Sequence, residues 1–434
     1  MDNIEQSTMK KVNRRLVPFL FLVYCVNFLD RVNVGFAALQ MNQELGFSAA
    51  TYGLGAGIFF MGYFLFEIPS NLALHKVGAR IWIARIMLTW GAVAIGMALV
   101  NSVNSFYLVR FLLGVAEAGF VPGLLLYVTY WYPERFRAGA ISKIWAATAI
   151  AVVIGSPVSG ALLSVSWFGI SGWRWMFIFE GAPAVLLAVV ALKYLTDRPE
   201  KALWLTAVER EWLKRELLRD DMAKKDVQVA SLTSSLTSSR VWLLSFAYFS
   251  LGCGFFGLNF WLPQIIKQAS GASNIAVGFL NAVPFLCAAI AMVYAGRSSD
   301  RSGDRKRFYV IGVVLGALCL TLSALVHNVL LALVLMCVST MSIWSVISIF
   351  WSLPSAFLTG TGAAAGLAVI NSIGGLGGFI GPYLIGWLRA MSSGYVTALL
   401  ALSLILILSA VVVALSKPLT AATNANESRR ERMS

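Results

Sequence analysis

The chain has 434 residues, of which 59% are hydrophobic and only 12% are charged, with a formal net charge of +14. A soluble globular domain has roughly 45–50% apolar and about 25% charged residues, so these values exclude a soluble enzyme, a disordered chain and a nucleic-acid-binding domain. A polytopic membrane protein remains. Because one spanning helix takes about 20 residues, the length allows roughly a dozen spans with their loops.

Twelve apolar runs of spanning length follow one another, six on each side of a long polar stretch. The sequence therefore predicts an all-α polytopic membrane protein made of two six-helix bundles. The bundles are expected over 1–196 and 241–416, joined by a linker loop over 197–240 and followed by a tail over 417–434. The predicted spans lie at 16–37, 51–74, 81–100, 104–130, 140–165, 175–195, 241–266, 275–296, 308–327, 328–352, 361–388 and 394–416.

The distribution of Lys and Arg predicts the orientation of these spans. With a cytoplasmic N-terminus, 29 of the 34 basic residues lie in cytoplasmic segments and three in outer segments, while Arg31 and Arg110 lie inside spans. We therefore expect a bacterial inner-membrane protein whose two termini and linker loop are cytoplasmic. The same bias accounts for the net charge, so no nucleic-acid partner is expected.

The linker loop is expected to hold one short helix. Thr206 and Glu209 have the spacing of a capping box, in which each side chain bonds the backbone N–H of the other residue. Trp212, Leu213 and Leu217 then form an amphipathic pattern, which favours an interfacial helix between the two bundles.

No residue pattern in the chain is typical of a metal or cofactor site. His75 and His327 are the only histidines, and they lie far apart in the sequence. The five cysteines all lie in apolar runs, where cysteine packs as a small hydrophobic residue. We therefore expect no metal centre, no disulfide and no bound cofactor.

Two landmarks recur in the two halves at one offset. Gly78 and Gly303 lie in basic loops after the second and eighth spans, and they are 225 residues apart. Pro157 and Pro382, in the fifth and eleventh spans, are also 225 residues apart. This agreement favours a duplicated six-helix bundle. Substrate sites in such repeats lie near the middle of the membrane, between the halves.

Ionisable residues inside the predicted spans are almost confined to the first half of the chain. A charged side chain near the middle of a bilayer costs roughly 3 kcal/mol or more, so each one is a candidate functional residue. Within the predicted spans of the second half, only Arg389, at an outer span end, is charged. The first half has Asp30, Arg31, Glu67, Arg110 and Glu117, with Lys143 and Glu180 nearer to span ends. The first five correspond, 225 residues later, to Phe255, Phe256, Met292, Leu335 and Ser342.

Four of these residues are expected to line one polar cavity. Asp30 and Arg110 lie at similar depths in their spans, and Glu117 lies two turns, about 10 Å, beyond Arg110 on the same helix face. A cation among them would hold an anionic substrate. Because a carboxyl group in apolar surroundings readily holds a proton near neutral pH, Asp30 and Glu117 are the candidate proton carriers. The alternative is a fixed ion pair between Asp30 and Arg110 that braces two helices.

The charged residues belong to longer motifs. These are Asp30-Arg-Val-Asn33, Gly62-Tyr-Phe-Leu-Phe-Glu67-Ile-Pro69-Ser-Asn71, Arg110-Phe-Leu-Leu-Gly114-Val-Ala-Glu117-Ala-Gly119, Gly172-Trp-Arg-Trp175 and Ile370-Asn371-Ser-Ile-Gly374. Together they resemble the major facilitator superfamily over essentially the whole chain. More narrowly, they are similar to the anion:cation symporter family, in the branch that holds tartrate, hydroxyphenylacetate, phthalate and sugar-acid permeases.

The resemblance implies a role for several residues. It implies that carboxyl groups carry the coupling proton, and that cations and polar side chains from both halves hold the anion. The first part agrees with the inference drawn above from the intramembrane charges. The proton-coupling residues are then Asp30 and Glu117, and the substrate-binding residues are Arg31, Tyr63, Arg110 and Asn371.

Four more residues are candidates for substrate contact or gating. Trp351 is expected to contact the substrate, with anchoring at the lipid interface as the alternative. For Glu67, near the inner end of the second span, a gating or packing role is favoured over coupling. Asp300 and Arg301 match the superfamily loop motif in the second half and are expected to act in gating. The first half departs from that motif, because His75 stands where an Asp is usual.

The expected function is proton-coupled symport of a small organic anion into the cell by alternating access. The protein is then a monomeric secondary transporter in the lipid bilayer and not an enzyme, with the proton as its coupling ion. The expected substrate is a tartrate-like hydroxydicarboxylate or a sugar acid, and the alternative is an aromatic acid such as hydroxyphenylacetate or phthalate. A proton-coupled exporter of the same fold and an anion-sensing transceptor are further alternatives.

Overall fold

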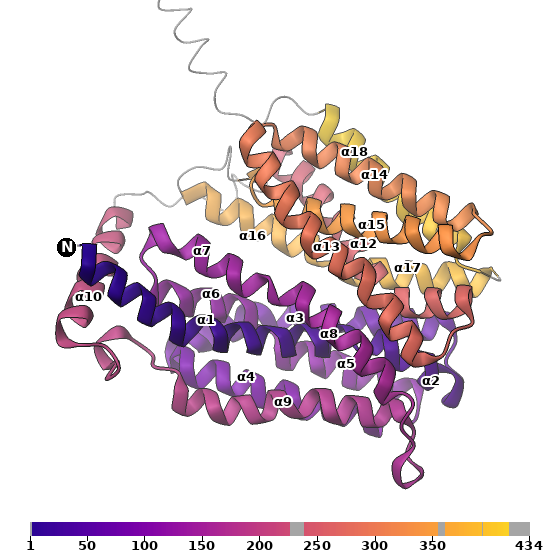
Figure 1. Ribbon diagram of the computed structural model, residues 1–434, viewed down its shortest axis with the longest axis horizontal. Helices are drawn as coiled ribbons and strands as arrows, with labels where there is room; N and C mark the ends of the chain where they lie inside the picture. The colour runs from indigo at the N-terminus through magenta and orange to yellow at the C-terminus, as the bar shows by residue number, and fades with distance from the viewer. Residues whose placement is uncertain (1, 226–237, 355–360, 393, 416–434) are drawn as a thin grey trace, which may run out of the picture. The chain divides into compact units, whose positions relative to one another are not determined.

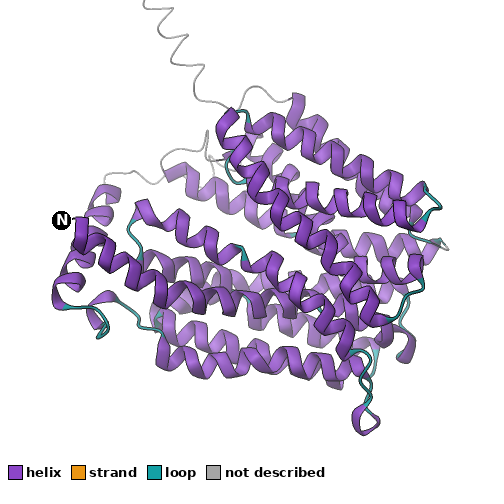
Figure 2. Cartoon of the chain, viewed as in Figure 1, coloured by secondary structure: helices purple, strands orange, loops and turns teal. Residues whose placement is uncertain are grey.

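The computed structural model describes residues 2–225, 238–354, 361–392 and 394–415. Within these ranges, twelve helical stretches are long and apolar enough to cross a membrane, and this confirms the predicted number (Figure 2). Most of them extend beyond the predicted apolar runs, because polar residues at their ends remain helical. The first, for example, covers Ile4–Glu44.

The helices divide into two compact units. The first unit comprises Met1–Asp226 and Asn259–Val283, and the second comprises Val227–Leu258 and Pro284–Ser434. The predicted tail over 417–434 and the middle of the predicted linker loop lie outside the described residues. The bundle boundaries inferred from the sequence stay a prediction.

The first unit is built mainly from the N-terminal half of the chain (Figure 1). Its closest helix pairs are α4 with α9 and α3 with α5, while α1 packs against both α8 and α9. Its helices are α1 (Asp2–Val32), α2 (Val34–Glu44), α3 (Ala49–Val77), α4 (Ala79–Gly96), η1 (Met97–Leu99), α5 (Val103–Glu117), α6 (Phe120–Trp131), α7 (Glu134–Trp145), α8 (Ala147–Leu162), η2 (Trp167–Gly169), α9 (Gly172–Tyr194), η3 (Pro199–Lys201) and α10 (Ala207–Lys225).

The second unit holds the remaining helices, apart from the parts of α12 and α13 that belong to the first unit. Its closest pairs are α14 with α15 and α14 with α18. The helices are α12 (Ser239–Ser270), α13 (Asn274–Ser302), α14 (Arg305–Leu325), α15 (Val329–Phe350), α16 (Thr361–Gly375), α17 (Gly377–Met391) and α18 (Val396–Leu415).

Glycines let helix backbones approach each other in both units. A Cβ atom at Gly114 of α5 would overlap the carbonyl oxygen of Phe59 on α3. A Cβ atom at Gly377 of α17 would likewise overlap the carbonyl oxygen of Phe249 on α12. Small residues at helix interfaces allow this approach, which gives van der Waals contact where lipid supplies no hydrophobic driving force. In the first unit it brings α3 and α5, which carry several of the candidate site residues, into direct contact.

The fourth span is confirmed as a membrane-crossing stretch, but it consists of two helices. α5 ends at Glu117, and Gly119 has a φ of 83°, a left-handed conformation that glycine adopts at little cost. A Cβ atom there would also overlap the side chain of Ser70 on α3. The break places Glu117 at the end of α5 and just before the N-terminus of α6, where a negative charge is favoured.

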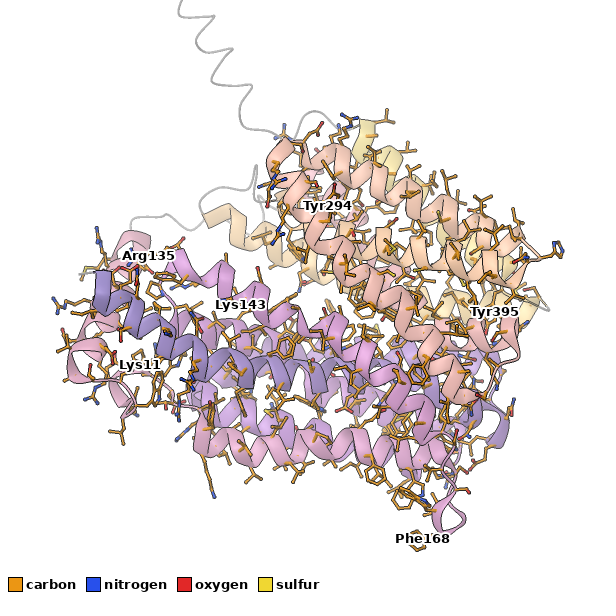
Figure 3. The ribbon with its side chains drawn as sticks, in the orientation of Figure 1. Lys11, Arg135, Lys143, Phe168, Tyr294 and Tyr395 are labelled. Atoms are coloured by element: carbon orange, nitrogen blue, oxygen red, sulfur yellow. The ribbon has the colours of Figure 1, made fainter. Side chains whose placement is uncertain are left out.

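The predicted helix in the linker loop is confirmed as α10. The N–H of Glu209 donates to the Thr206 hydroxyl at 3.3 Å, and the N–H of Thr206 donates to the Glu209 carboxylate at 2.9 Å. Lys11 of α1 lies 2.8 Å from that carboxylate, and Leu213 is fully buried. α10 is therefore docked on the N-terminal end of α1, where Figure 3 labels Lys11.

Candidate functional site

Asp30 and Arg31 are neighbours near the end of α1, yet they contact different helices. Successive residues of an α-helix point about 100° apart. The Asp30 carboxylate accepts a hydrogen bond at 2.8 Å from the indole N–H of Trp90 on α4, and the residue is 1% exposed. Arg31 forms an ion pair with Glu117 at the end of α5. The two predicted proton carriers, Asp30 and Glu117, therefore have different partners, and their shared cavity stays a prediction.

Glu117 has a cation partner that depth arguments along the sequence did not reveal. Its side chain is fully buried, and that of Arg31 is 12% exposed. One carboxylate oxygen pairs with Arg31, while Oε2 has no hydrogen-bond partner among the described residues. Removing one member of a buried ion pair leaves an uncompensated charge, which costs about 3–5 kcal/mol. Arg31 and Glu117 therefore depend on each other for charge balance.

Arg110 of α5 is fully buried, and it is not paired with Asp30. Its guanidinium donates to the backbone carbonyl oxygens of Gly55 at 3.1 Å and Ala56 at 3.0 Å, both on α3. Nη1 has no hydrogen-bond partner in the part of the chain that the structure describes. The alternative of a fixed Asp30–Arg110 brace is not what the structure contains. Arg110 thus presents a buried positive charge whose hydrogen bonds go to neutral carbonyl groups.

The ring of Phe59 on α3 lies close to the guanidinium groups of both arginines. Its centroid lies 5.3 Å from the guanidinium carbon of Arg31 and 5.2 Å from that of Arg110. Tyr63, one turn further along α3, lies 5.4 Å from the guanidinium carbon of Arg31. These distances are within the range of cation–π attraction. We refer to Arg31, Phe59, Tyr63, Arg110 and Glu117 as the arginine cluster.

Phe59 was missed by reasoning from the sequence. The chain has 27 phenylalanines, and nothing in the composition distinguishes this one. The available signal was the spacing of four residues to Tyr63, which places both rings on one face of α3. Glu67 follows four residues later on the same face and is half-buried. It forms no ion pair among the described residues, and its gating role stays a prediction.

The predicted substrate contacts of the second half lie in the second unit. Trp351 follows the end of α15, and its ring centroid is 4.8 Å from that of Tyr248 and 5.6 Å from that of Phe350. Asn371 is an exposed residue of α16. Aromatic packing thus accounts for the position of Trp351 within its unit, and the substrate contacts of both residues stay predictions.

The predicted gating residues of the second unit lie at the end of α13. Asp300 is 3.9 Å from Arg305 at the start of α14, and Arg305 donates to the carbonyl oxygen of Ser352 at 3.1 Å. Arg301, beside them, is exposed. These contacts connect the ends of three helices, α13, α14 and α15.

The corresponding loop of the first unit uses a different acid. Arg80 lies 3.5 Å from the carboxylate of Asp197, which follows α9, and the Arg80 N–H donates to it at 3.0 Å. The side chain of His75 lies outside the described residues, so its effect on this loop stays open. Asp197 was not singled out in the sequence because it lies 117 positions from Arg80.

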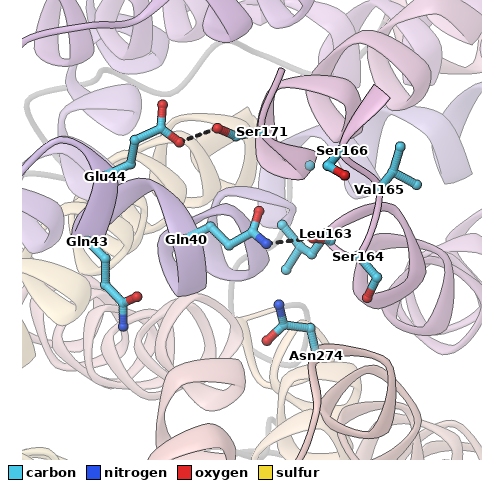
Figure 4. Close-up of a pocket in the computed structure, with 10 residues that line it drawn as sticks. Gln40, Gln43, Glu44, Leu163, Ser164, Val165, Ser166, Ser171 and Asn274 are labelled. Carbon is cyan, nitrogen blue, oxygen red and sulfur yellow. Dashed lines mark hydrogen bonds between the residues drawn. The ribbon is translucent and has the colours of Figure 1, made fainter. Parts of the chain in front are cut away.

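A pocket of about 530 Å³ lies at the ends of α2, α8 and α9 (Figure 4). Its lining contains the carboxylate of Glu44 and no cation. Glu44 is held by Arg174 at 3.2 Å, and Gln40 accepts a hydrogen bond from the N–H of Trp173 at 3.1 Å. A carboxylate in the lining repels an anion, so the arginine cluster is the better candidate for an anion site.

Comparisons with known proteins agree with this architecture. Residues 20–367 and 244–433 match the family described as Major Facilitator Superfamily. Two solved structures have the same fold: a bacterial homologue of the human lysosomal transporter Spinster, and a D-xylose–proton symporter. The first has a TM-score of 0.77 at 17% identity and covers 92% of this chain and 96% of its own. The second has a TM-score of 0.74 at 15% identity and covers 94% of this chain and 98% of its own.

Several relatives are similar over nearly their full length. A protein of Agrobacterium vitis named "Putative tartrate transporter" is 48% identical over 412 residues, which are 95% of this chain and 91% of that protein. The "Quinolone resistance transporter" of Acinetobacter baumannii is 42% identical over 93% of this chain and 94% of its own. The "Inner membrane transport protein RhmT" of Escherichia coli is 34% identical over 94% of both. The chain therefore belongs to the Major Facilitator Superfamily and is a multi-pass membrane transporter.

Proposed function

We propose that the protein is a proton-coupled symporter that takes up a small organic anion by alternating access. The observation that carries the proposal is the arginine cluster, in which two buried guanidinium groups flank Phe59 and only Arg31 is paired with a carboxylate. Buried cations suit an anionic substrate, and the planar guanidinium fork matches a carboxylate in two parallel hydrogen bonds.

The ion pair between Arg31 and Glu117 supplies the coupling. A proton on Glu117 removes its negative charge and frees Arg31 to bind the substrate carboxylate. By thermodynamic reciprocity, a bound anion on Arg31 then favours the protonated form of Glu117. Proton and anion therefore bind together and leave together, and a proton gradient drives accumulation of the anion. No catalytic step and no other coupling ion is part of this proposal.

The proposed substrate is a tartrate-like hydroxydicarboxylate, with sugar acids next. Two guanidinium groups suit two carboxylates of one small molecule, and relatives at 48% identity carry the name of a tartrate transporter. Tyr63 is proposed to contact the substrate from the first unit, and Asn371 and Trp351 from the second. Aromatic acids such as hydroxyphenylacetate and phthalate are the alternative, because the rings of Phe59 and Tyr63 offer stacking surfaces.

The membrane setting is proposed from the charge bias and the relatives' names. The bias in Lys and Arg favours cytoplasmic termini, and one relative is named an inner membrane transport protein. We propose a monomer in the bacterial inner membrane. Gating is proposed for Glu67, Asp300 and Arg301, and it predicts that their variants change uptake rates more than anion affinity.

Drug export is a second candidate, because a relative at 42% identity is named a quinolone resistance transporter. A quinolone also carries a carboxylate, so the same arginines suit it. The two candidates differ in direction. Export predicts that cells expressing the protein tolerate more quinolone, whereas symport predicts uptake of a carboxylate along an inward proton gradient.

The test is uptake into proteoliposomes with an imposed pH gradient. The panel contains tartrate, galactonate, rhamnonate, hydroxyphenylacetate and phthalate. We expect one of them to accumulate, with accumulation lost in Asp30→Asn and in Glu117→Gln. Glu209→Gln is the matched control, since it makes the same chemical change outside the membrane spans. Uptake that ignores the pH gradient would overturn the proton coupling, and raised quinolone tolerance without carboxylate uptake would favour export.

A further inference from the structure

Glu180 is a buried carboxyl group outside the arginine cluster. The sequence placed it near a span end, where a side chain can reach the membrane surface, but on α9 it is only 3% exposed. The hydroxyl group of Ser159 on α8 donates to its Oε1 atom at 2.6 Å. Its Oε2 atom has no hydrogen-bond partner within the described ranges. Only one of the two carboxyl oxygens therefore has a hydrogen-bond partner, although the residue is buried in the first unit.

Asp30 of α1 lies in the same part of the first unit as Glu180 of α9. Leu29 precedes Asp30 and packs against Gly155 on α8, one turn before Ser159. On α4, Gly91 follows Trp90 and packs against Ala184 on α9, one turn after Glu180. Asp30 accepts from Trp90 through one oxygen, and its Oδ1 atom has no hydrogen-bond partner in the described part of the chain. Two half-satisfied carboxyl groups therefore share one buried region between α1, α4, α8 and α9.

No cation compensates this pair among the described residues. On α1, Arg31 is directed toward Glu117. On α9 and α2, Arg174 and Glu44 are paired with each other. α8 has no charged residue. On α4, Arg80 is paired with Asp197, and Arg85 stacks on Trp82 and lies five residues from Trp90, on a different face of the helix.

This charge balance differs from that of the arginine cluster. Two carboxylates in one buried site repel each other, so both do not stay ionised together. Without a cation, a proton is what relieves the repulsion and the cost of burial. Glu117, in contrast, is balanced by Arg31 whenever no anion competes for that arginine.

We propose that Asp30 and Glu180 form a carboxyl pair that binds a second coupling proton, in addition to the one on Glu117, and that Glu180 is a further proton-binding residue of the transporter. The inference rests on the proposed symport and deepens it. α1 then carries one member of the carboxyl pair, Asp30, on one side and the anion-binding Arg31 on the other. A proton bound by the pair changes the charge beside Asp30, and Asp30 is the direct neighbour in sequence of Arg31, the arginine proposed to hold the substrate.

The test compares two assays on the same proteoliposomes. Accumulation driven by a pH gradient requires proton coupling, whereas exchange of labelled for unlabelled anion across the membrane requires no net proton movement. Glu180→Gln keeps the size of the side chain and removes its titration. We expect this variant to accumulate much less anion along the pH gradient and to keep exchange, with Glu209→Gln as the unaffected control.

A second variant keeps the proposal testable if Glu180→Gln does not insert or bind the anion. Ser159→Ala keeps the carboxyl group and removes its hydrogen bond, so the pH profile of wild-type uptake should shift in the variant. Wild-type uptake that ignores the pH gradient would overturn the proposed symport itself. Proton-coupled wild-type uptake together with fully coupled Glu180→Gln, or an unshifted Ser159→Ala profile, would overturn only the role of Glu180.

Discussion

The interiors of the two units differ in charge although their sequences repeat at one offset. In the first unit, Arg31 and Glu117 form a buried ion pair and Arg110 is fully buried. At the corresponding place in the second unit, the ring of Phe255 lies 4.9 Å from that of Phe256 and 4.7 Å from that of Trp344. Aromatic packing thus fills in one unit the region that ionisable groups occupy in the other.

The comparison separates what holds the fold together from what the transporter needs for its chemistry. Both units use glycine contacts between helices, at Gly114 and at Gly377. Only the first has buried charges among the described residues, and buried charges cost stability unless they are well paired. The charges are therefore not needed to build a six-helix unit of this kind. Their position is best explained by a function that requires titration and anion binding.

The largest expected effect is the same in both units. Gly114→Val and Gly377→Val each put a side chain where a neighbouring backbone carbonyl already lies. We expect each variant to lose most of the folded protein, because backbone atoms cannot move aside without separating the helices. Size-exclusion chromatography of detergent-solubilised protein measures the folded fraction. A folded variant in one unit alone would break the symmetry of packing that we infer.

The next effect should differ sharply between the units. Arg110→Met removes a buried cation from the arginine cluster, whereas Leu335→Met changes the residue at the corresponding position of the second unit. We expect Arg110→Met to abolish anion uptake without loss of folded protein, since a buried charge with no carboxylate partner is removed. Leu335→Met should change anion uptake and the amount of folded protein only a little, because volume-conserving apolar exchanges cost less than about 1.5 kcal/mol.

Arg110→Lys sharpens this comparison. Lysine keeps the charge but lacks the planar fork that bonds a carboxylate twice. We expect uptake in this variant to fall about tenfold or more, by weaker substrate binding, which corresponds to the roughly 1.4 kcal/mol of one good hydrogen bond. Anion binding measured by isothermal calorimetry checks the result. Wild-type affinity in Arg110→Lys would mean that Arg110 acts only as a structural cation.

The smallest effect concerns acids near helix ends. Burial of Glu209 opposes its ionisation, but hydrogen bonds from Lys11, the Thr206 N–H and Ser7 outweigh it and hold its pKa at about 2. Glu209→Gln should therefore destabilise the docked α10 by about 1 kcal/mol near neutral pH. Because the pKa is lowered on folding, this stabilisation is present above the ordinary value near 4.5 and is lost as the pH falls toward 2.

The matched variant in the second unit is Asp300→Asn. The side chain of Asp300 is 75% exposed and lies 3.9 Å from Arg305, so its loss should change stability by a few tenths of a kcal/mol at most. Hydrogen exchange of α10 and of the start of α14, measured at pH 7 and at pH 3, gives both effects. Equal protection of α10 in wild type and Glu209→Gln at pH 7 would contradict the role of Glu209.

Elements that depend on neighbours along the chain could be predicted from the amino-acid sequence. Apolar length fixes the twelve spans, because each must match the bilayer. The capping box of Thr206 and Glu209 follows from a spacing of three residues within one helix turn. The confinement of charge to one half is likewise read directly from composition along the spans.

The partners of the charged residues depend instead on how the helices pack in three dimensions. The sequence suggested a shared cavity or an Asp30–Arg110 brace, whereas Arg31 pairs with Glu117, Asp30 with Trp90, and Arg110 with carbonyl groups of α3. These partners lie 54 to 86 residues apart, so helix rotation and side-chain reach select them. The burial of Glu180 has the same origin, since it depends on how α9 packs against α1, α4 and α8 and not on its distance from a span end.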